Sequence, residues 1–139
     1  MASTLHGKDI LRTDPLTDAE LDLILFTAAH FERELDSGQH ANRMAGQVMA
    51  AMFFEPSTRT RLSFEAAMHR LGGDVITIAD PKTSSAVKGE SMGDAVRVIE
   101  GYADVIVMRH PRKGSAQEAA DAVSIPVING GDGAGQHPT

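Results

Sequence analysis

Residues 53–73 read FFEPSTRTRLSFEAAMHRLGG, and this stretch decides the fold predicted for the chain. It begins at the end of an apolar run, QVMAAMFF at residues 47–54, which is typical of a buried strand in a parallel sheet. Polar and basic residues follow at a turn. A helical pattern then extends from Leu62 to Leu71 and stops at Gly72 and Gly73, since glycine commonly ends a helix. The stretch therefore predicts a strand, a polar turn and a helix in succession.

The same alternation continues on both sides of this unit. Three further strands are predicted downstream, at residues 74–79, 103–108 and 125–129. Ser91 and Ser115 would cap the helices between them. Upstream, Thr17 and Glu20 form a capping-box pattern before an amphipathic helix that continues to about Leu35. Strand and helix therefore alternate along nearly the whole chain.

Strands that alternate with helices of this length favour right-handed crossovers and a parallel sheet. We predict an α/β fold: a three-layer domain with a mainly parallel four-stranded sheet and helices on both faces. The sequence has no internal repeat and no stretch with the composition of an interdomain linker. We therefore expect residues 1–139 to form one domain.

Composition and charge narrow the classes of function. The 139 residues carry a net charge of −6 and 4% aromatic residues. Binding to nucleic acid or to a membrane surface usually needs a basic face, and single-strand binding needs aromatic stacking platforms, so we predict neither partner. No apolar run approaches the ~18 residues that can cross a bilayer. The sequence has no cysteine, which is compatible with a cytoplasmic location.

Polar side chains gather where the predicted strands end, which is where open parallel sheets bind ligands. They supply cations, hydroxyls and imidazole, and they are Glu55, Ser57, Thr58, Arg59, Thr60 and Arg61 after the first strand, Thr83, Ser84, Ser85 and Lys88 after the second, Arg109 and His110 after the third, and Asn129 and His137 after the fourth. Because the carboxyl ends of parallel strands meet at one edge, the sequence predicts an anion site there.

The turn after the first strand carries the clearest signal. Ser57 or Thr58 can cap the following helix, which leaves N–H groups of the first turn beside the positive end of the helix dipole. These groups favour a phosphate or a carboxylate, and the guanidinium of Arg59 adds a fork suited to phosphate oxygens. The alternative is a solvent-exposed cap with surface arginines.

The other candidates also leave alternatives open. Arg109 ends an apolar strand and would point at the ligand edge, and the alternative is a pair with Asp80 or Asp104. Lys88 is compatible with a solvated lysine in a long polar loop, and His137 with a structural histidine. The histidines lack metal-ligand spacing such as H-E-x-x-H, so we predict no metal site. Nucleotide-binding patterns such as G-x-x-x-x-G-K-[ST] are absent as well.

Four segments together resemble one family. FFEPSTRTRLSFEAAMHRLGG, SSAVKGES, GYADVIVMRHP and PVINGGDGAGQHPT are similar to the carbamoyl-phosphate half of aspartate carbamoyltransferases, in the same order along nearly the whole chain. The S-T-R-T-R element is specific to carbamoyltransferases. Ornithine-specific relatives typically carry an H-P-C-Q element, whereas Arg109-His110-Pro111, Lys88-Gly89-Glu90 and His137-Pro138-Thr139 fit the aspartate enzymes better. The resemblance implies carbamoyl transfer from carbamoyl phosphate to the amino group of L-aspartate, in pyrimidine biosynthesis.

The resemblance also implies a role for each matching residue. Carbamoyl phosphate would be bound by Ser57, Thr58, Arg59, Thr60, Arg109 and His137, of which the last four would be catalytic. Thr60, Arg109 and His137 would polarise the carbonyl and stabilise the oxyanion that forms when the aspartate amine attacks. Ser84 and Lys88 would act in a neighbouring subunit's site. A homotrimer of catalytic chains is therefore expected, with regulatory or other pathway subunits as further partners. No cofactor is implied.

The family continues past the position of Thr139 with a glutamine that contacts the carbamoyl group, and then with a second, aspartate-binding domain. We therefore expect this chain to supply the carbamoyl-phosphate half of the site and to be inactive alone. The alternative is a non-catalytic module, derived from that domain, that binds anions or assembles with full-length chains. A response-regulator-like or nucleotide-binding domain is disfavoured, because the strand ends carry neither an acidic cluster nor a phosphate-loop lysine pattern.

Overall fold

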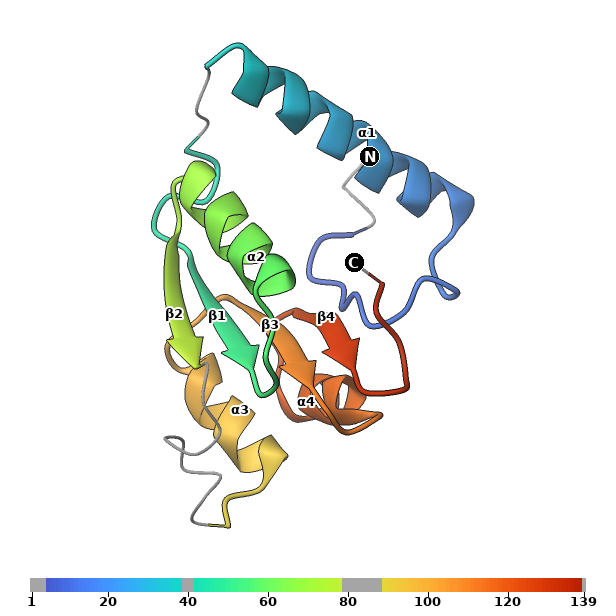
Figure 1. Cartoon of the computed structure of the whole chain (residues 1–139), viewed down its shortest axis with the longest axis vertical. Helices are drawn as coiled ribbons and strands as arrows, with labels where there is room; N and C mark the ends of the chain where they lie inside the picture. Colours follow the sequence, from blue (N-terminus) through green and yellow to red (C-terminus); the bar gives the residue numbers. More distant parts are fainter. Residues whose placement is uncertain (1–4, 39–41, 79–88, 139) are drawn as a thin grey trace.

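The computed structural model describes residues 5–38, 42–78 and 89–138, and it has the α/β architecture that the sequence predicts. Along the chain the elements are α1 (Asp18–Asp36), β1 (Val48–Phe53), α2 (Arg59–Arg70), β2 (Asp74–Ile78), α3 (Met92–Glu100), β3 (Val105–His110), α4 (Ser115–Ala122) and β4 (Val127–Asp132). The strands form one sheet in the order β2-β1-β3-β4, and each neighbouring pair is parallel (Figure 1). The predicted fold class is confirmed.

Helices cover both faces of the sheet. On one face, Val96 of α3 and Ala119 of α4 pack in a cluster with Ile106 of β3. On the other face, Met68 of α2 packs with Val107, the next residue of the same strand. Successive side chains of a strand point to opposite faces, so one short apolar run serves both clusters. This explains why the strands read as continuous apolar runs rather than as alternating patterns.

A short segment before α1 extends the sheet beyond β4. Ile10 forms a parallel bridge with Ile128. The N–H of Ile10 donates to the carbonyl of Val127 at 2.9 Å, and the carbonyl of Ile10 accepts the N–H of Asn129 at 2.9 Å. Asp9 adds a side-chain acceptor for the N–H of Val127 at 2.8 Å. The backbone of β4 is therefore paired on both sides along part of its length.

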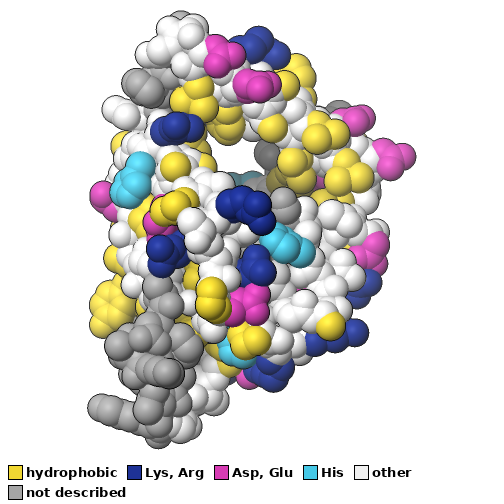
Figure 2. All heavy atoms as spheres, viewed as in Figure 1, with side chains coloured by type: hydrophobic (Ala, Val, Ile, Leu, Met, Phe, Trp, Pro, Cys, Tyr) yellow, Lys and Arg dark blue, Asp and Glu magenta, His cyan; other side chains and the backbone are white. Residues whose placement is uncertain are grey.

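Helix α1 lies apart from the sheet at the top of Figure 1. Its capping box is present as predicted, with Thr17 as N-cap and the Glu20 carboxylate accepting the N–H of Thr17 at 2.8 Å. Much of its apolar stripe stays open to solvent: Leu25 is 67% exposed and Phe26 is 68% exposed. Figure 2 shows hydrophobic side chains along the viewed face of this helix. The structure confirms the helix but leaves its apolar side chains largely uncovered.

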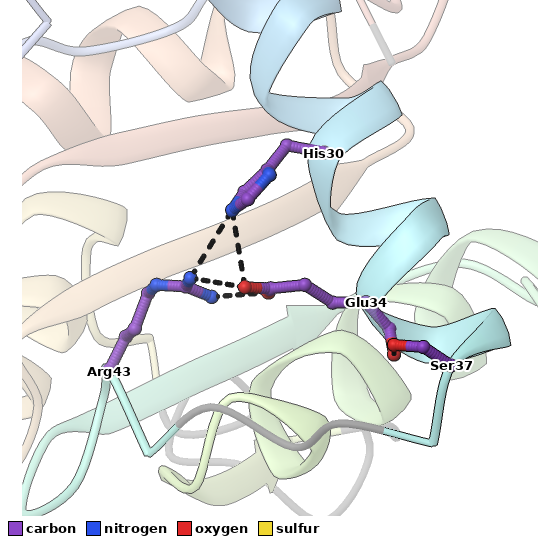
Figure 3. A network of polar contacts seen from close by, with 4 residues as sticks. All are labelled: His30, Glu34, Ser37 and Arg43. Carbon is purple, nitrogen blue, oxygen red and sulfur yellow. Dashed lines mark hydrogen bonds and ion pairs between the residues drawn. The ribbon is translucent and has the colours of Figure 1, made fainter.

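The far end of α1 is joined to the segment before β1 by an ion-pair network (Figure 3). Both terminal nitrogens of Arg43 donate to the carboxylate of Glu34, at 2.7 and 2.6 Å, and His30 lies 3.2 Å from the same carboxylate. The Arg43 guanidinium also stacks over Phe31, 5.0 Å from the ring centre. The hydrogen bonds from Arg43 hold the pKa of Glu34 below its ordinary value. The ion pair between Arg43 and Glu34 therefore links the C-terminal part of α1 to the segment before β1.

Acid should loosen the near end of α1. The Lys8 ammonium donates to Glu20 at 2.6 Å, and with the N–H of Thr17 it lowers the pKa of Glu20 from 4.5 to about 2. The carboxylate therefore stabilises the folded state fully above pH 4.5, and this contribution is lost as the pH falls towards 2. Glu20→Gln should be less stable than the wild type at pH 7, in urea unfolding followed by circular dichroism, and the difference should shrink below pH 4.5.

Asp22→Asn, an exposed change on the same helix, serves as the control and should leave stability nearly unchanged at either pH. A Glu20→Gln deficit of equal size at pH 7 and pH 2.5 would contradict the assigned ion pair.

Two helix starts differ in detail from the sequence predictions. The α2 helix begins at Arg59, earlier than the apolar pattern from Leu62 indicates, with Thr58 as its N-cap. Ser115 does not cap α4, because the N-cap is Gly114, with φ at 83°, and Ser115 is the first helical residue and fully buried. The prediction of a Ser115 cap was wrong. In the described part of the chain, no helix is long and apolar enough to cross a membrane.

Candidate functional site

A cavity opens at the carboxyl end of β1. It has a volume of about 430 Å³ and is lined by Pro56, Ser57, Thr58, Arg59, Thr60 and Arg109. Five of these six residues are predicted binding residues, and they come from two different segments of the chain. Figure 2 shows Arg or Lys and His side chains gathered on the middle of this face. The size is within the usual range of small-ligand sites, and the lining is polar and cationic.

The start of α2 has an unusual charge pattern. The other helices carry acidic residues in the first turn, as the helix dipole favours: Asp18 and Glu20 in α1, Asp94 in α3 and Glu118 in α4. The first turn of α2 has no acidic residue and instead carries Arg59 and Arg61, and Thr58 makes no side-chain capping bond. Cations at the positive end of a helix are unfavourable alone and favourable beside an anion. The pattern therefore indicates an anion at this position.

Arg109 reaches the cavity from the end of β3. The register places it beside Phe53, the last residue of β1, and its carbonyl accepts the N–H of Phe54 at 2.8 Å. Its Nε atom donates to the carboxylate of Glu55 at 2.5 Å. Asp104 is not its partner, because that carboxylate accepts the N–H of Val48 at 2.8 Å. Asp80, the other alternative, lies outside the described residues.

The end of β4 and the turn that follows it pack against the same arginine. A Cβ atom on Gly131, whose φ is 123°, would lie 3.5 Å from the Arg109 guanidinium carbon, so the glycine backbone lies directly against it. A Cβ on Gly130 would lie 3.6 Å from the methyl group of Thr60. His137, at the end of this turn, has its Nε2 atom 3.4 Å from a terminal nitrogen of Arg109. Segments that follow β1, β3 and β4 thus meet at one point.

The structure brings together six of the eight predicted site residues. Ser57, Thr58, Arg59, Thr60 and Arg109 line the cavity, and His137 touches its edge through Arg109. Ser84 and Lys88 lie outside the described residues. The roles of all eight stay predictions. Within residues 5–38, 42–78 and 89–138 there is no cluster of His, Asp and Glu that could hold a metal ion.

Two other polar residues near the cavity, Arg61 on α2 and His110 on β3, direct their side chains to other partners. The Arg61 side chain lies along α2, 3.7 Å from Glu65. His110 accepts the backbone N–H of Arg112 at 3.0 Å and packs edge-on against Phe54, with ring centres 5.3 Å apart. Burial, and then the nearby Arg112 cation, lower the pKa of His110 and favour its neutral form. The positive charge at the cavity therefore comes from the arginines.

Sequence reasoning missed two parts of the site. Pro56 lines the cavity, and no local pattern marks it as more than a turn residue. Glu55 was named only as one of the polar residues after the first strand, yet it binds the Arg109 guanidinium. The only signal for that pair is the parallel register of β1 with β3, which places the ends of the two strands side by side.

The fold and the cavity together have the character of an anion-binding α/β domain. Residues 8–139 match the family described as "Aspartate/ornithine carbamoyltransferase, carbamoyl-P binding domain". The chain belongs to this family.

Relatives and solved structures agree with that assignment. The chain is 49% identical to the aspartate carbamoyltransferase catalytic subunit of Methanopyrus kandleri, over 99% of its own length and 44% of the relative's. It is also 49% identical to the Picrophilus torridus subunit of the same name, over 97% of this chain and 44% of the relative. The chain thus spans less than half the length of these relatives.

Among solved structures, a Trypanosoma cruzi aspartate transcarbamoylase in complex with carbamoyl phosphate and aspartate superposes with a TM-score of 0.92. It is 40% identical, and the superposition covers 98% of this chain and 42% of that one. A complex of the same organism's enzyme with N-(phosphonacetyl)-L-aspartic acid gives the same TM-score at 39% identity.

Proposed function

We propose that this chain supplies the carbamoyl-phosphate half of an aspartate carbamoyltransferase site. The reaction would move the carbamoyl group of carbamoyl phosphate to the amino group of L-aspartate, giving N-carbamoyl-L-aspartate and phosphate. The observation that carries the proposal is the cavity at the start of α2, where Arg59, Arg109 and three hydroxyl side chains meet. The printed names of the relatives, and the ligands in the related structures, support the same substrates.

Different residues of the site would bind the phosphate and the carbonyl oxygen of one carbamoyl phosphate molecule. Ser57, Thr58 and the first-turn N–H groups of α2 would hold the phosphate oxygens, with Arg59 as the charged fork. Thr60, Arg109 and His137 would surround the carbonyl oxygen. They would stabilise the negative charge that develops on it when the amine attacks, before the carbon–oxygen bond to phosphate breaks. The 3.4 Å separation of Arg109 and His137 allows both to approach one oxygen atom.

The remaining parts of the site would come from outside the described residues. Aspartate would be bound by a second domain, as the greater length of the relatives suggests. Ser84 and Lys88 would contribute to a neighbouring subunit's site within a homotrimer, with regulatory or other pathway subunits as further partners. On this proposal the reaction belongs to pyrimidine biosynthesis in the cytoplasm, and this chain alone transfers little or no carbamoyl group.

Arg59→Ala tests the cavity directly. The change removes one charge-assisted contact to the phosphate, so carbamoyl phosphate should bind more weakly by about 1.5–3 kcal/mol, a loss of roughly tenfold to 150-fold. Isothermal titration calorimetry at low ionic strength measures it. Arg97→Ala is the matched control, because Arg97 lies on α3 in an exposed pair with Asp94. Unchanged affinity in Arg59→Ala would refute the assigned role.

The alternative of a non-catalytic module is separated from this proposal by two observations. The genomic reading frame after codon 139 either continues into a second α/β region or stops, and a stop codon favours the module. A robust rate of carbamoylaspartate formation by the isolated chain would contradict both the half-site and the non-catalytic module. Neither would form this product alone, because nothing in the described residues offers a site for the carboxylates of aspartate.

A further inference from the structure

Two polar side chains at the end of β4 are almost completely buried. Asn129 is 1% exposed and Asp132 is 7% exposed, and neither is part of the cavity lining. Burying an amide or a carboxylate is costly unless hydrogen bonds replace the lost water. The bonds that these two side chains make therefore show what they hold in place.

Asn129 uses its amide group fully. Its Nδ2 atom donates to the carbonyl of Leu11 at 3.1 Å and to the carbonyl of Gln136 at 3.2 Å. Its Oδ1 atom accepts the N–H of Gly131 at 2.8 Å. One side chain thus binds the backbone before α1, the bend at Gly131 and the residue that precedes His137.

Asp132 holds the other side of the same residue. One carboxylate oxygen accepts the N–H of Gln136 at 2.5 Å, and the other accepts the N–H of Gly114 at 2.9 Å. Gly114 is the N-cap of α4, and the Asp132 carboxylate, from the end of β4, satisfies its backbone N–H at the start of this helix. Burial alone would raise the pKa of Asp132, but the hydrogen bonds from Gln136 and Gly114 outweigh it and lower the pKa. The carboxylate therefore stays ionised.

The turn is also shaped around this carboxylate. A Cβ atom on Gly135 would collide with a carboxylate oxygen of Asp132, so this position needs the absence of a side chain. The Asp132 side chain links the loop after β3, which follows Arg109, to the turn that ends in His137. Neither Asn129 nor Asp132 lines the cavity, so binding of an anion there does not by itself explain why they are buried.

We propose that Asn129 and Asp132 are positioning residues that grip Gln136 from both sides and thereby hold the His137 imidazole beside Arg109. The pair acts on the backbone, because Asn129 binds the carbonyl of Gln136 and Asp132 binds its N–H. The N–H lies in the peptide unit before Gln136 and the carbonyl in the unit after it, so the backbone is held on both sides of this residue and enters His137 in a fixed direction. This inference rests on the proposed role of His137 at the carbamoyl group.

A double-mutant cycle separates positioning from general stability. Asp132→Asn keeps the shape but replaces one acceptor oxygen with an NH₂ group, which cannot accept from a backbone N–H. Asp132→Asn and His137→Ala should each weaken carbamoyl phosphate binding, by about fivefold to tenfold, and the double variant should be no weaker than either. Multiplying losses would overturn the proposal. Asp121→Asn, a surface change on α4, is the matched control.

Measurements without ligand keep this test independent of the proposed function. In Asp132→Asn the NMR signals of the His137 ring should move towards those of an unstructured histidine while the core amide signals stay unchanged. In the wild-type chain, the amides of Gln136 and Gly114 should exchange with solvent at least tenfold more slowly than that of Lys113, although all three residues are exposed. Unshifted His137 signals, or fast exchange at Gln136, would overturn the positioning role. If the His137 signals shift in Asp132→Asn and the Gln136 amide exchanges slowly in the wild type, but the wild type binds no carbamoyl phosphate, then only the proposed function is refuted.

Discussion

Phe53→Ala should lower the free energy of unfolding by about 3–5 kcal/mol, a large share of the 5–15 kcal/mol typical of a domain. Phe53 is 1% exposed and packs with Met68 and Val107 in the cluster between the sheet and α2. Its ring also lies 3.7 Å from where a Cβ of Gly130 would stand, so it supports the end of β4. Removing it would leave a cavity under both features. Urea unfolding followed by circular dichroism measures the loss.

Phe26→Ala gives the same chemical change at a position that is 68% exposed. It should alter stability by no more than about 0.5 kcal/mol. Equal effects of the two substitutions would mean that the packing between α2 and the sheet does not limit the stability of the domain.

Arg109→Ala should have the largest effect on ligand binding. It removes a charge-assisted bond to the anion, and it also leaves the Glu55 carboxylate unpaired at the edge of the cavity, where it repels a phosphate. We expect carbamoyl phosphate to bind about 3–5 kcal/mol more weakly, on the order of a thousandfold, by calorimetry. The double variant Arg109→Ala with Glu55→Gln should regain part of this loss, because the repelling charge is gone.

Arg112→Ala is the control for this pair, since Arg112 lies on the same loop and is bound to Glu118 at 2.5 Å in an exposed ion pair. It should bind carbamoyl phosphate like the wild type. If the double variant binds no better than Arg109→Ala, then Glu55 orients the arginine without acting electrostatically on the ligand.

Most of the fold could be predicted from the sequence because its signals are local. The capping box at Thr17, the cap at Ser91 and the apolar runs of the strands each lie within a few residues. The start of α4 could not be predicted in this way. Ser115 has a side chain suited to a cap, but the N-cap is Gly114, whose backbone N–H donates to the carboxylate of Asp132 on β4. Long-range contacts of this kind leave no pattern in the neighbouring sequence.

The candidate site could likewise be predicted only where its residues lie close together in the sequence. The residues of the S-T-R-T-R element could be assigned together, because they follow one another at a single helix start. The partner of Arg109 could not, because Glu55 lies 54 residues earlier in the chain and the pairs considered from the sequence were with Asp80 and Asp104. The strand order, which places β1 between β2 and β3, decides that pairing. The conformation of His137 likewise depends on buried groups that look like ordinary strand and turn residues.

The bridge between Ile10 and Ile128 has a consequence for the order in which the domain folds. Asp9 and Val127 are separated by 118 residues, and closing a loop of that size costs entropy before any contact compensates for it. During synthesis the segment around Ile10 leaves the ribosome first but has no edge to pair with until β4 has been made. It should therefore dock late, and a refolding experiment should show the amides of Ile10 and Asn129 becoming protected after those of β1 and β3.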